Sequence, residues 1–395
     1  MAREAPHLLC PQHVAALQSS AGNKTVQGLF GIGKKKKPTG TGALTFDNTQ
    51  WANTRYLGAS SEGSNGVLFA GARDKEVVVK PGEAMDVEGG VASYLISHAV
   101  AAGGTGMALA PGYRLASATE TRQMEQTFKG LVPAAGKERR VATLIGKLSA
   151  GKVVVQDMAQ GKPLNKALDD LPKHTKQRRF GGGRKLRSNS PMKVFTDART
   201  VHAMGSAHAA DMFSGNDDRL AGFNLENLMV SGKGLEMIDH VMDVNRSHLR
   251  SFTVGKGLLA TKHSADSAFA EWKAHPRTQQ LAAGKFDQVA AEIFQTLLKG
   301  APMALSHLDV LDSGQGKQHG RDVDADAIQD ILLGFQDRFE AAFAQGLEAG
   351  RAQLIRSLDQ LLNTKGKLDE LAGGQDVTEV RRSLMLRRDY LVNGS

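Results

Sequence analysis

Short apolar runs separated by glycine-rich turns characterise the chain between residues 57 and 158. Runs of this kind, bounded by Gly, Asn and Asp, predict short β-strands. Five are present: one beginning at Leu57 and others at 67–70, 76–80, 107–115 and 152–158. Apolar residues at three- and four-residue intervals between Val91 and Val100 predict a helix that begins near Asp86. The polar segment 120–149 predicts an insert with a helix before the fifth strand.

The second half of the chain carries mainly helical spacing. Helices are predicted at 191–212, 286–297, 328–361 and 384–388, and a surface loop at 305–322. A hairpin interrupts this pattern, because the apolar runs 228–230 and 235–238 flank the turn Ser-Gly-Lys-Gly. The chain therefore predicts an α+β protein with a small β-rich lobe at 46–162 and a larger helical lobe at 163–395, which includes extra C-terminal helices.

Composition places the chain among proteins with a large buried core. It has 395 residues, of which 41% are apolar and 23% charged, and it contains a single cysteine, Cys10. One cysteine excludes an internal disulfide and suits a reducing cytosol. No run of about 18 apolar residues is present, and the start lacks the pattern of a signal peptide. We therefore expect no transmembrane segment and no ordinary signal-peptide export.

The formal charge of +9 is concentrated at 34–37 and 173–187. Neither segment has the interleaved aromatic residues on which bases stack, so no specific nucleic-acid binding is expected. Residues 1–45 are predicted to be a leader and linker outside the core. The segment 173–187, KHTKQRRFGGGRKLR, is either a disordered, solvated loop or a docking site for an acidic protein or an anionic membrane.

The densest group of chemically useful residues lies in the loop and hairpin at 211–239, DMFSGNDDRLAGFNLENLMVSGKGLEMID. It contains a loop Asp, a later Asn just before the hairpin, and an Asp just after it. Phosphoryl transfer needs such a set: one carboxylate orients the acceptor hydroxyl or takes its proton, and an amide and a second carboxylate hold Mg²⁺. An Asn- and Asp-rich turn before an ordinary hairpin is the alternative interpretation.

Residues suited to gripping a triphosphate precede this loop. The turn Gly63-Ser64-Asn65-Gly66 joins two strands and can offer backbone N–H groups to phosphates. Lys80 ends an apolar strand, as in the V-A-I-K pattern of kinases. Glu88, in the first turn of the next helix, can pair with Lys80, and Glu83 is its competitor. A surface lysine on an ordinary hairpin is the alternative for Lys80.

The stretch from Gln156 to Gly161 is predicted to be the hinge between the lobes. Its backbone groups are placed to bind an adenine edge, with Gln156 and Met158 as the expected contacts, and Gly161 lets the chain turn.

Charged and imidazole side chains beside the loop invite two further interpretations. Arg219 is expected to anchor the loop through a bidentate bond to a neighbouring carboxylate. His202, His208 and Asp211 are alternatives as metal ligands, but they lack the HExxH spacing. Core or supporting roles are therefore predicted, with His208 bracing Asp211 or the loop backbone.

The pattern GN-DR…N…ID, carried by Gly215-Asn216, Asp218-Arg219, a following Asn and Ile238-Asp239, resembles the atypical kinases of the actin-fragmin kinase, HipA-like and phosphatidylinositol 3/4-kinase group. The interval from Asp218 to Asn227 is about four residues longer than in the HRDxxxxN pattern of protein kinases. The chain reads Asp-His-Val where protein kinases have DFG. The resemblance covers about residues 55–245, and it implies a bilobal, protein-kinase-like fold that uses ATP and Mg²⁺.

The resemblance also implies a role for each matching residue. Asp218 is implied as the catalytic aspartate, and Asp239 as a metal ligand. Asn227 is implied as the second metal ligand, with Asn224 as its rival.

A second resemblance concerns the start of the chain. The string ALQ-x-S-AGN-x-x-V within residues 13–30 is similar to a segment near the starts of proteins linked to bacterial contractile injection systems. This similarity implies that residues 1–30 are a loading signal for the injection machinery. The protein would then be made in the bacterial cytoplasm and delivered into another cell. A frayed N-terminal helix is the alternative.

The favoured function is an effector or toxin kinase that phosphorylates a hydroxyl on a host protein, and the resemblance implies an actin-like one. A lipid kinase or a nucleotidylyl-transferring pseudokinase of the same fold is the first alternative. A non-catalytic, exported binding module is the alternative from another class.

Overall fold

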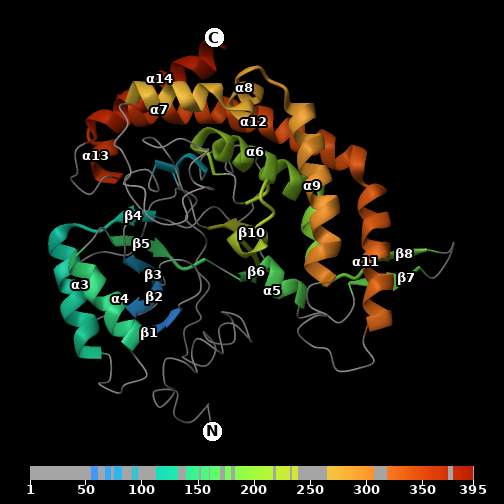
Figure 1. The fold of residues 1–395 in the computed structure, drawn as a ribbon, viewed down its shortest axis with the longest axis horizontal. Coiled ribbons are helices and arrows are strands. Elements are labelled where there is room, and N and C mark those ends of the chain that lie inside the picture. Colours follow the sequence, from blue (N-terminus) through green and yellow to red (C-terminus); the bar gives the residue numbers. More distant parts are fainter. Residues whose placement is uncertain are drawn as a thin grey trace, which may run out of the picture.

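The computed structural model describes residues 55–60, 67–72, 75–81, 91–92, 94–96, 113–131, 139–150, 153–159, 161–169, 174–178, 183–216, 219–231, 234–238, 265–306, 318–371 and 377–394. In these residues the chain forms a mixed α+β fold that is mostly helical, with small antiparallel sheets. The largest sheet and two helices beside it lie at one end of the molecule, and long helices arch over the rest (Figure 1). The predicted α+β class is therefore confirmed.

The largest sheet has five strands in the order β1-β2-β3-β5-β4, and each neighbouring pair is antiparallel. The strands are β1 (Arg55–Ser60), β2 (Val67–Ala72), β3 (Lys75–Pro81), β4 (Tyr113–Leu115) and β5 (Val153–Asp157). Valine dominates β3 and β5, since β-branched side chains fit a buried, pleated surface. The five predicted strands are confirmed, although residues 107–112 of the fourth lie outside the described part.

The two faces of this sheet bury different neighbours. One face packs against α3 (Ala118–Leu131) and α4 (Arg139–Ala150). Because side chains alternate along a strand, Lys80 and its register partner Val154 lie on the opposite face. Val154 is fully buried in the main core, together with apolar residues of the helical part. The face that carries Lys80 is therefore the one that meets the rest of the molecule.

The chain passes from β5 directly into a second sheet, with the order β10-β9-β6. Its strands are β6 (Lys162–Pro163), β9 (Leu228–Ser231) and β10 (Gly234–Met237). Gly161, just before β6, has a φ of +98°, and a Cβ there would lie 2.1 Å from the carbonyl oxygen of Val230. Only glycine tolerates both conditions. The predicted turn at Gly161 and the predicted hairpin after the loop are both confirmed.

Helices make up most of the remaining structure. They are α5 (Leu164–Asp169), η3 (Pro191–Phe195), α6 (Ala198–Ser214), η4 (Leu225–Asn227), α7 (Ala265–Ala274), α8 (Pro276–Ala282), α9 (Phe286–Ser306), α11 (Gln318–Leu333), α12 (Gln336–Asn363), α13 (Lys367–Leu371) and α14 (Thr378–Asn393). The side chain of Asp197 caps α6 by accepting from the Thr200 N–H at 2.9 Å. From Ala203 to Ser214 every residue of α6 is buried, so α6 is the central helix of this part.

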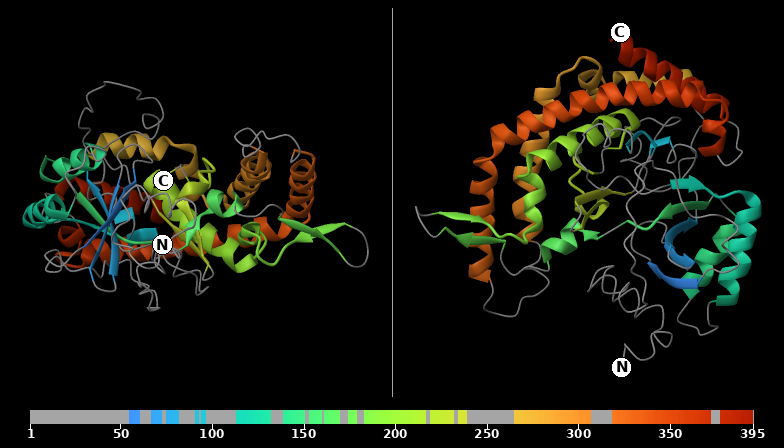
Figure 2. Two further views of the ribbon diagram at one scale, coloured as in Figure 1. Left: turned by 90° about the horizontal axis from the view of Figure 1, so that it is seen from below. Right: turned by 180° about the vertical axis from the view of Figure 1, so that it is seen from behind.

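The long helix α12 arches along α6 (Figure 2). Glycines allow the two backbones to approach closely: a Cβ at Gly346 would lie 2.0 Å from the carbonyl oxygen of His202, and one at Gly205 would lie 2.2 Å from that of Phe343. The hydroxyl of Ser206 donates to the carbonyl of Gly346 at 3.0 Å. This contact fixes the register of α12 on α6, and with it the position of the α6 C-terminus.

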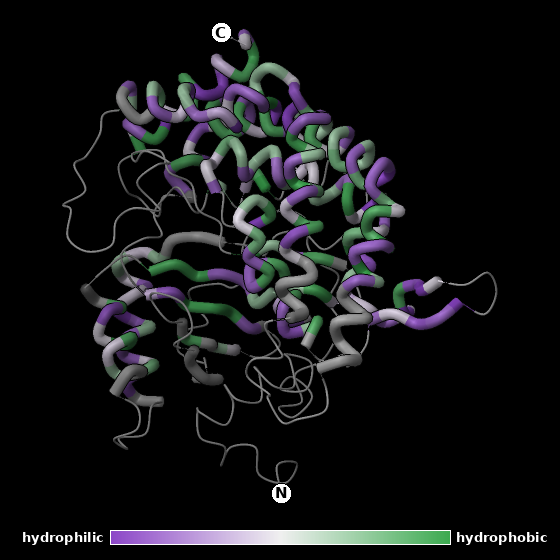
Figure 3. The backbone as a smooth tube through the Cα atoms, turned by 45° about the vertical axis from the view of Figure 1, so that its right-hand side comes forward, coloured by the Kyte–Doolittle hydropathy of each residue, from purple (hydrophilic) through white to green (hydrophobic). Residues whose placement is uncertain are grey.

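The basic segment forms structure instead of a wholly disordered loop. Strands β7 (Thr175–Gln177) and β8 (Arg184–Leu186) pair as an antiparallel hairpin. Thr175 is fully buried, and Leu186 packs against the main core. The hairpin projects beyond α11 and is mostly hydrophilic (Figure 3). The expectation of a disordered, solvated loop was wrong here, because strand pairing and an anchored base order a sequence that has no apolar alternation.

Three other expectations change. The insert at 120–149 holds two helices, α3 and α4. Residues 305–306 and 318–322 of the expected surface loop are helical. The apolar stripe 328–361 belongs to two helices, because the chain breaks at Gly334 between α11 and α12. Among the described residues, no helix combines the length and apolarity that a membrane crossing requires.

Candidate phosphotransfer site

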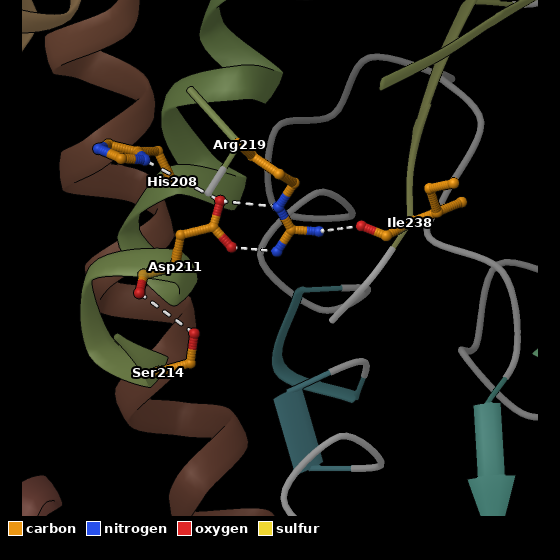
Figure 4. A network of polar contacts seen from close by, with 5 residues as sticks. All are labelled: His208, Asp211, Ser214, Arg219 and Ile238. Carbon is orange, nitrogen blue, oxygen red and sulfur yellow. Dashed lines mark hydrogen bonds and ion pairs between the residues drawn. The ribbon is translucent and has the colours of Figure 1, made fainter. Parts of the chain in front are cut away.

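A buried ion pair closes the base of the predicted catalytic loop. Asp211 lies in the last turn of α6, and Arg219 lies beyond the loop, yet both side chains are fully buried. Nε of Arg219 donates to Oδ2 of Asp211 at 3.2 Å, and Nη2 donates to Oδ1 in a shorter contact (Figure 4). This fork is the bidentate bond expected of Arg219, and Asp211 is the carboxylate that accepts it.

The same guanidinium reaches the hairpin. Nη1 of Arg219 donates to the carbonyl of Ile238 at 3.1 Å (Figure 4). The carbonyl of Arg219 in turn accepts from the Asn224 N–H at 2.9 Å. Arg219 therefore joins the end of α6, the loop before η4 and the residue that follows β10.

The end of α6 is shaped around Asp211. Its backbone carbonyl accepts from the N–H groups of Gly215 and Asn216 at 2.8 and 3.0 Å, and from the Ser214 hydroxyl at 3.1 Å. Gly215 has a φ of 78°, a left-handed conformation that suits glycine at a helix C-terminus. Nδ1 of His208 lies 3.9 Å from Oδ2 of Asp211, too far for a hydrogen bond, so the bracing role of His208 stays a prediction.

The two candidate amides differ in their surroundings. Asn224 caps η4, since its side-chain oxygen accepts from the Glu226 N–H at 3.1 Å. Asn227 is buried, and its backbone carbonyl accepts from the Ile238 N–H at 3.0 Å. Since Leu228 pairs with Met237, this bond extends the hairpin by one step. Asn227 therefore lies opposite Ile238.

The predicted nucleotide contacts that the structure describes are Lys80 on β3, Gln156 in β5 and Met158 just after β5. Lys80 is half-buried, so part of its side chain is exposed to solvent. Gln156 is only 2% exposed, and its Oε1 finds no hydrogen-bond partner among the described residues. By alternation Gln156 shares a face with Lys80. The Met158 N–H donates to the carbonyl of Glu76 at 3.1 Å, so this amide is engaged within the sheet.

Several predicted residues lie outside the described part of the chain. They are Gly63, Ser64, Asn65, Gly66, Glu88, Asp218 and Asp239, together with the leader 1–45. Within the described ranges, no group of three or more His, Cys, Asp or Glu side chains could hold a metal ion. The metal-ligand interpretation of His202, His208 and Asp211 is therefore wrong. These residues lie on a helix whose buried polar groups support the loop.

Sequence reasoning missed a second anchor at the end of α6. The carbonyl of Phe213 accepts from Nε1 of Trp272 at 2.9 Å and from Nη1 of Arg387 at 3.2 Å. The guanidinium of Arg387 is fully buried and lies 5.0 Å from the Trp272 ring centroid. A cation at a helix C-terminus is favoured by the helix dipole. The helical spacing Val380, Leu384, Arg387 and Leu391 puts this arginine on the buried face of α14, and that spacing is the signal that could have found it.

Comparisons with known proteins place the chain in no family. No family model, no curated protein sequence and no solved structure matches it.

Proposed function

We propose that the chain is an ATP- and Mg²⁺-dependent phosphotransferase with a bilobal, protein-kinase-like fold of the atypical kind, acting on a protein hydroxyl. The observation that carries the proposal is the Arg219 guanidinium, which bonds both the Asp211 carboxylate and the Ile238 carbonyl. Asp218 precedes Arg219 in the chain, and Asp239 follows Ile238. One buried side chain thus ties together the two positions next to the predicted acids.

Asn227 supports the same arrangement from the other strand. It lies opposite Ile238, the residue that precedes Asp239 in the sequence. An amide oxygen and a carboxylate are the hard ligands that Mg²⁺ accepts. In the proposal Asn227 and Asp239 hold the ion, which neutralises phosphate charge when bound. Asn224 is the weaker choice, because its amide oxygen already caps η4.

Asp218 acts on the acceptor in this proposal. Its carboxylate orients the substrate hydroxyl and takes its proton during transfer. Arg219 does not touch the substrate; it holds the loop at both ends.

The small sheet supplies the nucleotide side of the proposed cleft. Val154, opposite Lys80, belongs to the same large buried core as Leu228 and Met237 of the hairpin, which supports a Lys80 face turned toward the loop. Lys80 then grips phosphates and Glu88 pairs with its ammonium. The orphaned Oε1 of Gln156 on this face is an acceptor that the exocyclic amine of adenine would satisfy. These residues fit ATP.

The proposed acceptor is a protein hydroxyl in a target cell. The similarity of residues 13–30 to segments of injection-system proteins supports a protein substrate in a target cell and a loading signal at 1–30. A lipid hydroxyl, or transfer of a nucleotidyl group, uses the same pocket and differs only in what is modified.

Labelled-ATP transfer tests the proposal. The protein is incubated with γ-labelled ATP and Mg²⁺, alone and in eukaryotic lysate, beside Asp218→Asn, Asp239→Asn and the exposed control Asp330→Asn. We expect labelling by the wild type and the control, and none by the two loop variants. Equal labelling by Asp218→Asn would remove its catalytic role. ATP with Mg²⁺ at a hundredfold excess over Kd should raise the free energy of unfolding by about 2.7 kcal/mol. This gain is read as a higher melting temperature. No shift at all would favour the non-catalytic binding module.

A further inference from the structure

The β7–β8 hairpin carries its cations on one side. Lys176 and Lys185 are direct cross-strand partners, and such partners point to the same face of a hairpin. Hydrogen bonds continue the ladder at both ends, from the Arg178 N–H to Gly183 O at 3.1 Å and from the Arg187 N–H to His174 O at 2.8 Å. Alternation then adds Arg178 and Arg187 to the face of the two lysines.

The opposite face is the anchored one. It carries Thr175, which is fully buried, and Leu186, which packs against the main core. Arg184 on this face donates to the Thr175 hydroxyl at 2.6 Å. Helix α11 contacts both strands (Figures 1 and 2). The base of the hairpin is therefore anchored, with His174 buried on the other face, and beyond this base the face of Lys176 and Lys185 is exposed.

The outward face has an unusual charge pattern. Beyond the base it carries the exposed cations Lys176, Arg178, Lys185 and Arg187, with Gly183, and none of these cations makes a salt bridge to a described residue. At the base, His174 is buried on the same face, and Nε of Arg187 donates to the Thr175 carbonyl at 3.1 Å, so Lys176 and Lys185 are the central pair. Like charges directly opposite each other across a strand pair destabilise it. An anionic ligand on this face removes that repulsion. No apolar side chain is present on this described face to insert into a bilayer.

We propose that this face, called the basic face below, docks a carboxylate-rich segment of another protein. Cations two residues apart along each strand are about 6.6–6.8 Å apart, which is also the spacing of alternate side chains in an extended acidic segment. Guanidinium and ammonium groups bind carboxylates through charge-assisted hydrogen bonds. The proposal concerns binding only and stands independently of the phosphotransfer proposal.

Fluorescence anisotropy with a labelled peptide of alternating Glu and Ser residues tests the proposal on the full-length protein. The double variant Lys176→Glu/Lys185→Glu reverses the central pair, and Lys176→Gln/Lys185→Gln only neutralises it. The matched control is Lys147→Glu/Lys365→Glu, which makes the same charge change at exposed lysines on α4 and after α12. We expect the reversal to weaken binding about tenfold or more, the neutralised variant to be intermediate, and the control to match the wild type.

Salt and competing anions complete the experiment. Binding should vanish near 1 M salt, where the screening length is about 3 Å. Vesicles with anionic lipid and a single-stranded oligonucleotide are the competitors. Neither competitor should show binding that depends on Lys176 and Lys185 and is tighter than that of the peptide. Equal weakening in the matched control, absence of peptide binding, or tighter lysine-dependent binding to either competitor would overturn the proposal. Unchanged melting temperatures of the variants exclude unfolding as the cause.

Discussion

Replacing Asp211 by Leu leaves the Arg219 guanidinium buried without its carboxylate. Both side chains are fully buried, so water cannot take the place of the lost partner. Removing one member of a buried pair typically destabilises a protein by about 3–5 kcal/mol. The free energy of unfolding of a typical protein is about 5–15 kcal/mol. For a protein in the middle of that range, the loss is about a third to a half of the total. We expect a correspondingly lower urea midpoint for Asp211→Leu and for Arg219→Met.

The double variant Asp211→Leu/Arg219→Met separates pairing from packing. It removes both charges, so it should lose less stability than the sum of the single variants, with a coupling energy of about 2–3 kcal/mol. The matched surface pair is Asp266 and Arg382, whose side chains are 58% and 59% exposed and 2.6 Å apart. Asp266→Asn should lower stability by less than about 1 kcal/mol. Urea titrations followed by circular dichroism measure all four proteins.

Additive losses in the double variant, or single losses no larger than that of Asp266→Asn, would refute this account of the ion pair. The same variants report on the loop. If Arg219 positions the residues beside it, Arg219→Met should lose phosphate transfer even at temperatures where it remains folded.

Three smaller perturbations test other features. Gly346→Ala places a methyl 2.0 Å from the carbonyl oxygen of His202, and overpacking of this kind should lower stability by about 1–3 kcal/mol in a urea titration. Gly161→Ala places a methyl 2.1 Å from the carbonyl oxygen of Val230 and forces alanine into a φ of +98°. The backbone strain alone should lower stability by about 1–3 kcal/mol, and the clash adds to this loss. The urea midpoint measures the total. Burial raises the pKa of the Tyr94 hydroxyl, so the folded state retains this proton longer than the unfolded state does. Stability should therefore fall as pH rises above about 10, and less so in Tyr94→Phe; identical pH profiles would contradict the assignment.

Local patterns predicted much of the fold. The five strands and the hairpin after the loop follow from short apolar runs bounded by turn residues, and Gly161 marks a turn that only glycine can make. The expectation that Arg219 binds a carboxylate follows from the planar fork of donors that a guanidinium offers. Its partner Asp211 could not be assigned, because the pairing depends on where α6 ends relative to the hairpin.

Other features depend on tertiary contacts that leave no local signal. The β7–β8 strands contain almost no apolar residues, so period-two spacing is absent, and the order comes from Thr175 and Leu186 at the base. The helix breaks at Gly334, although the helical spacing of apolar residues in the sequence continues across this position. Arg387 shares the helix face of Val380, Leu384 and Leu391, but this spacing does not say that a guanidinium is buried there against Trp272. Asp218 and Asp239 lie outside the described residues, so their roles stay predictions.

The bonds from Trp272 and Arg387 to Phe213 have a practical consequence for dissecting the chain. The predicted resemblance to atypical kinases ends near residue 245, which invites a minimal fragment with that boundary. Such a fragment would strip α7, α12 and α14 from the helix on which the loop is mounted. The smallest fragment that preserves the loop conformation must therefore extend through α14. A fusion partner should not replace the last turns of α14.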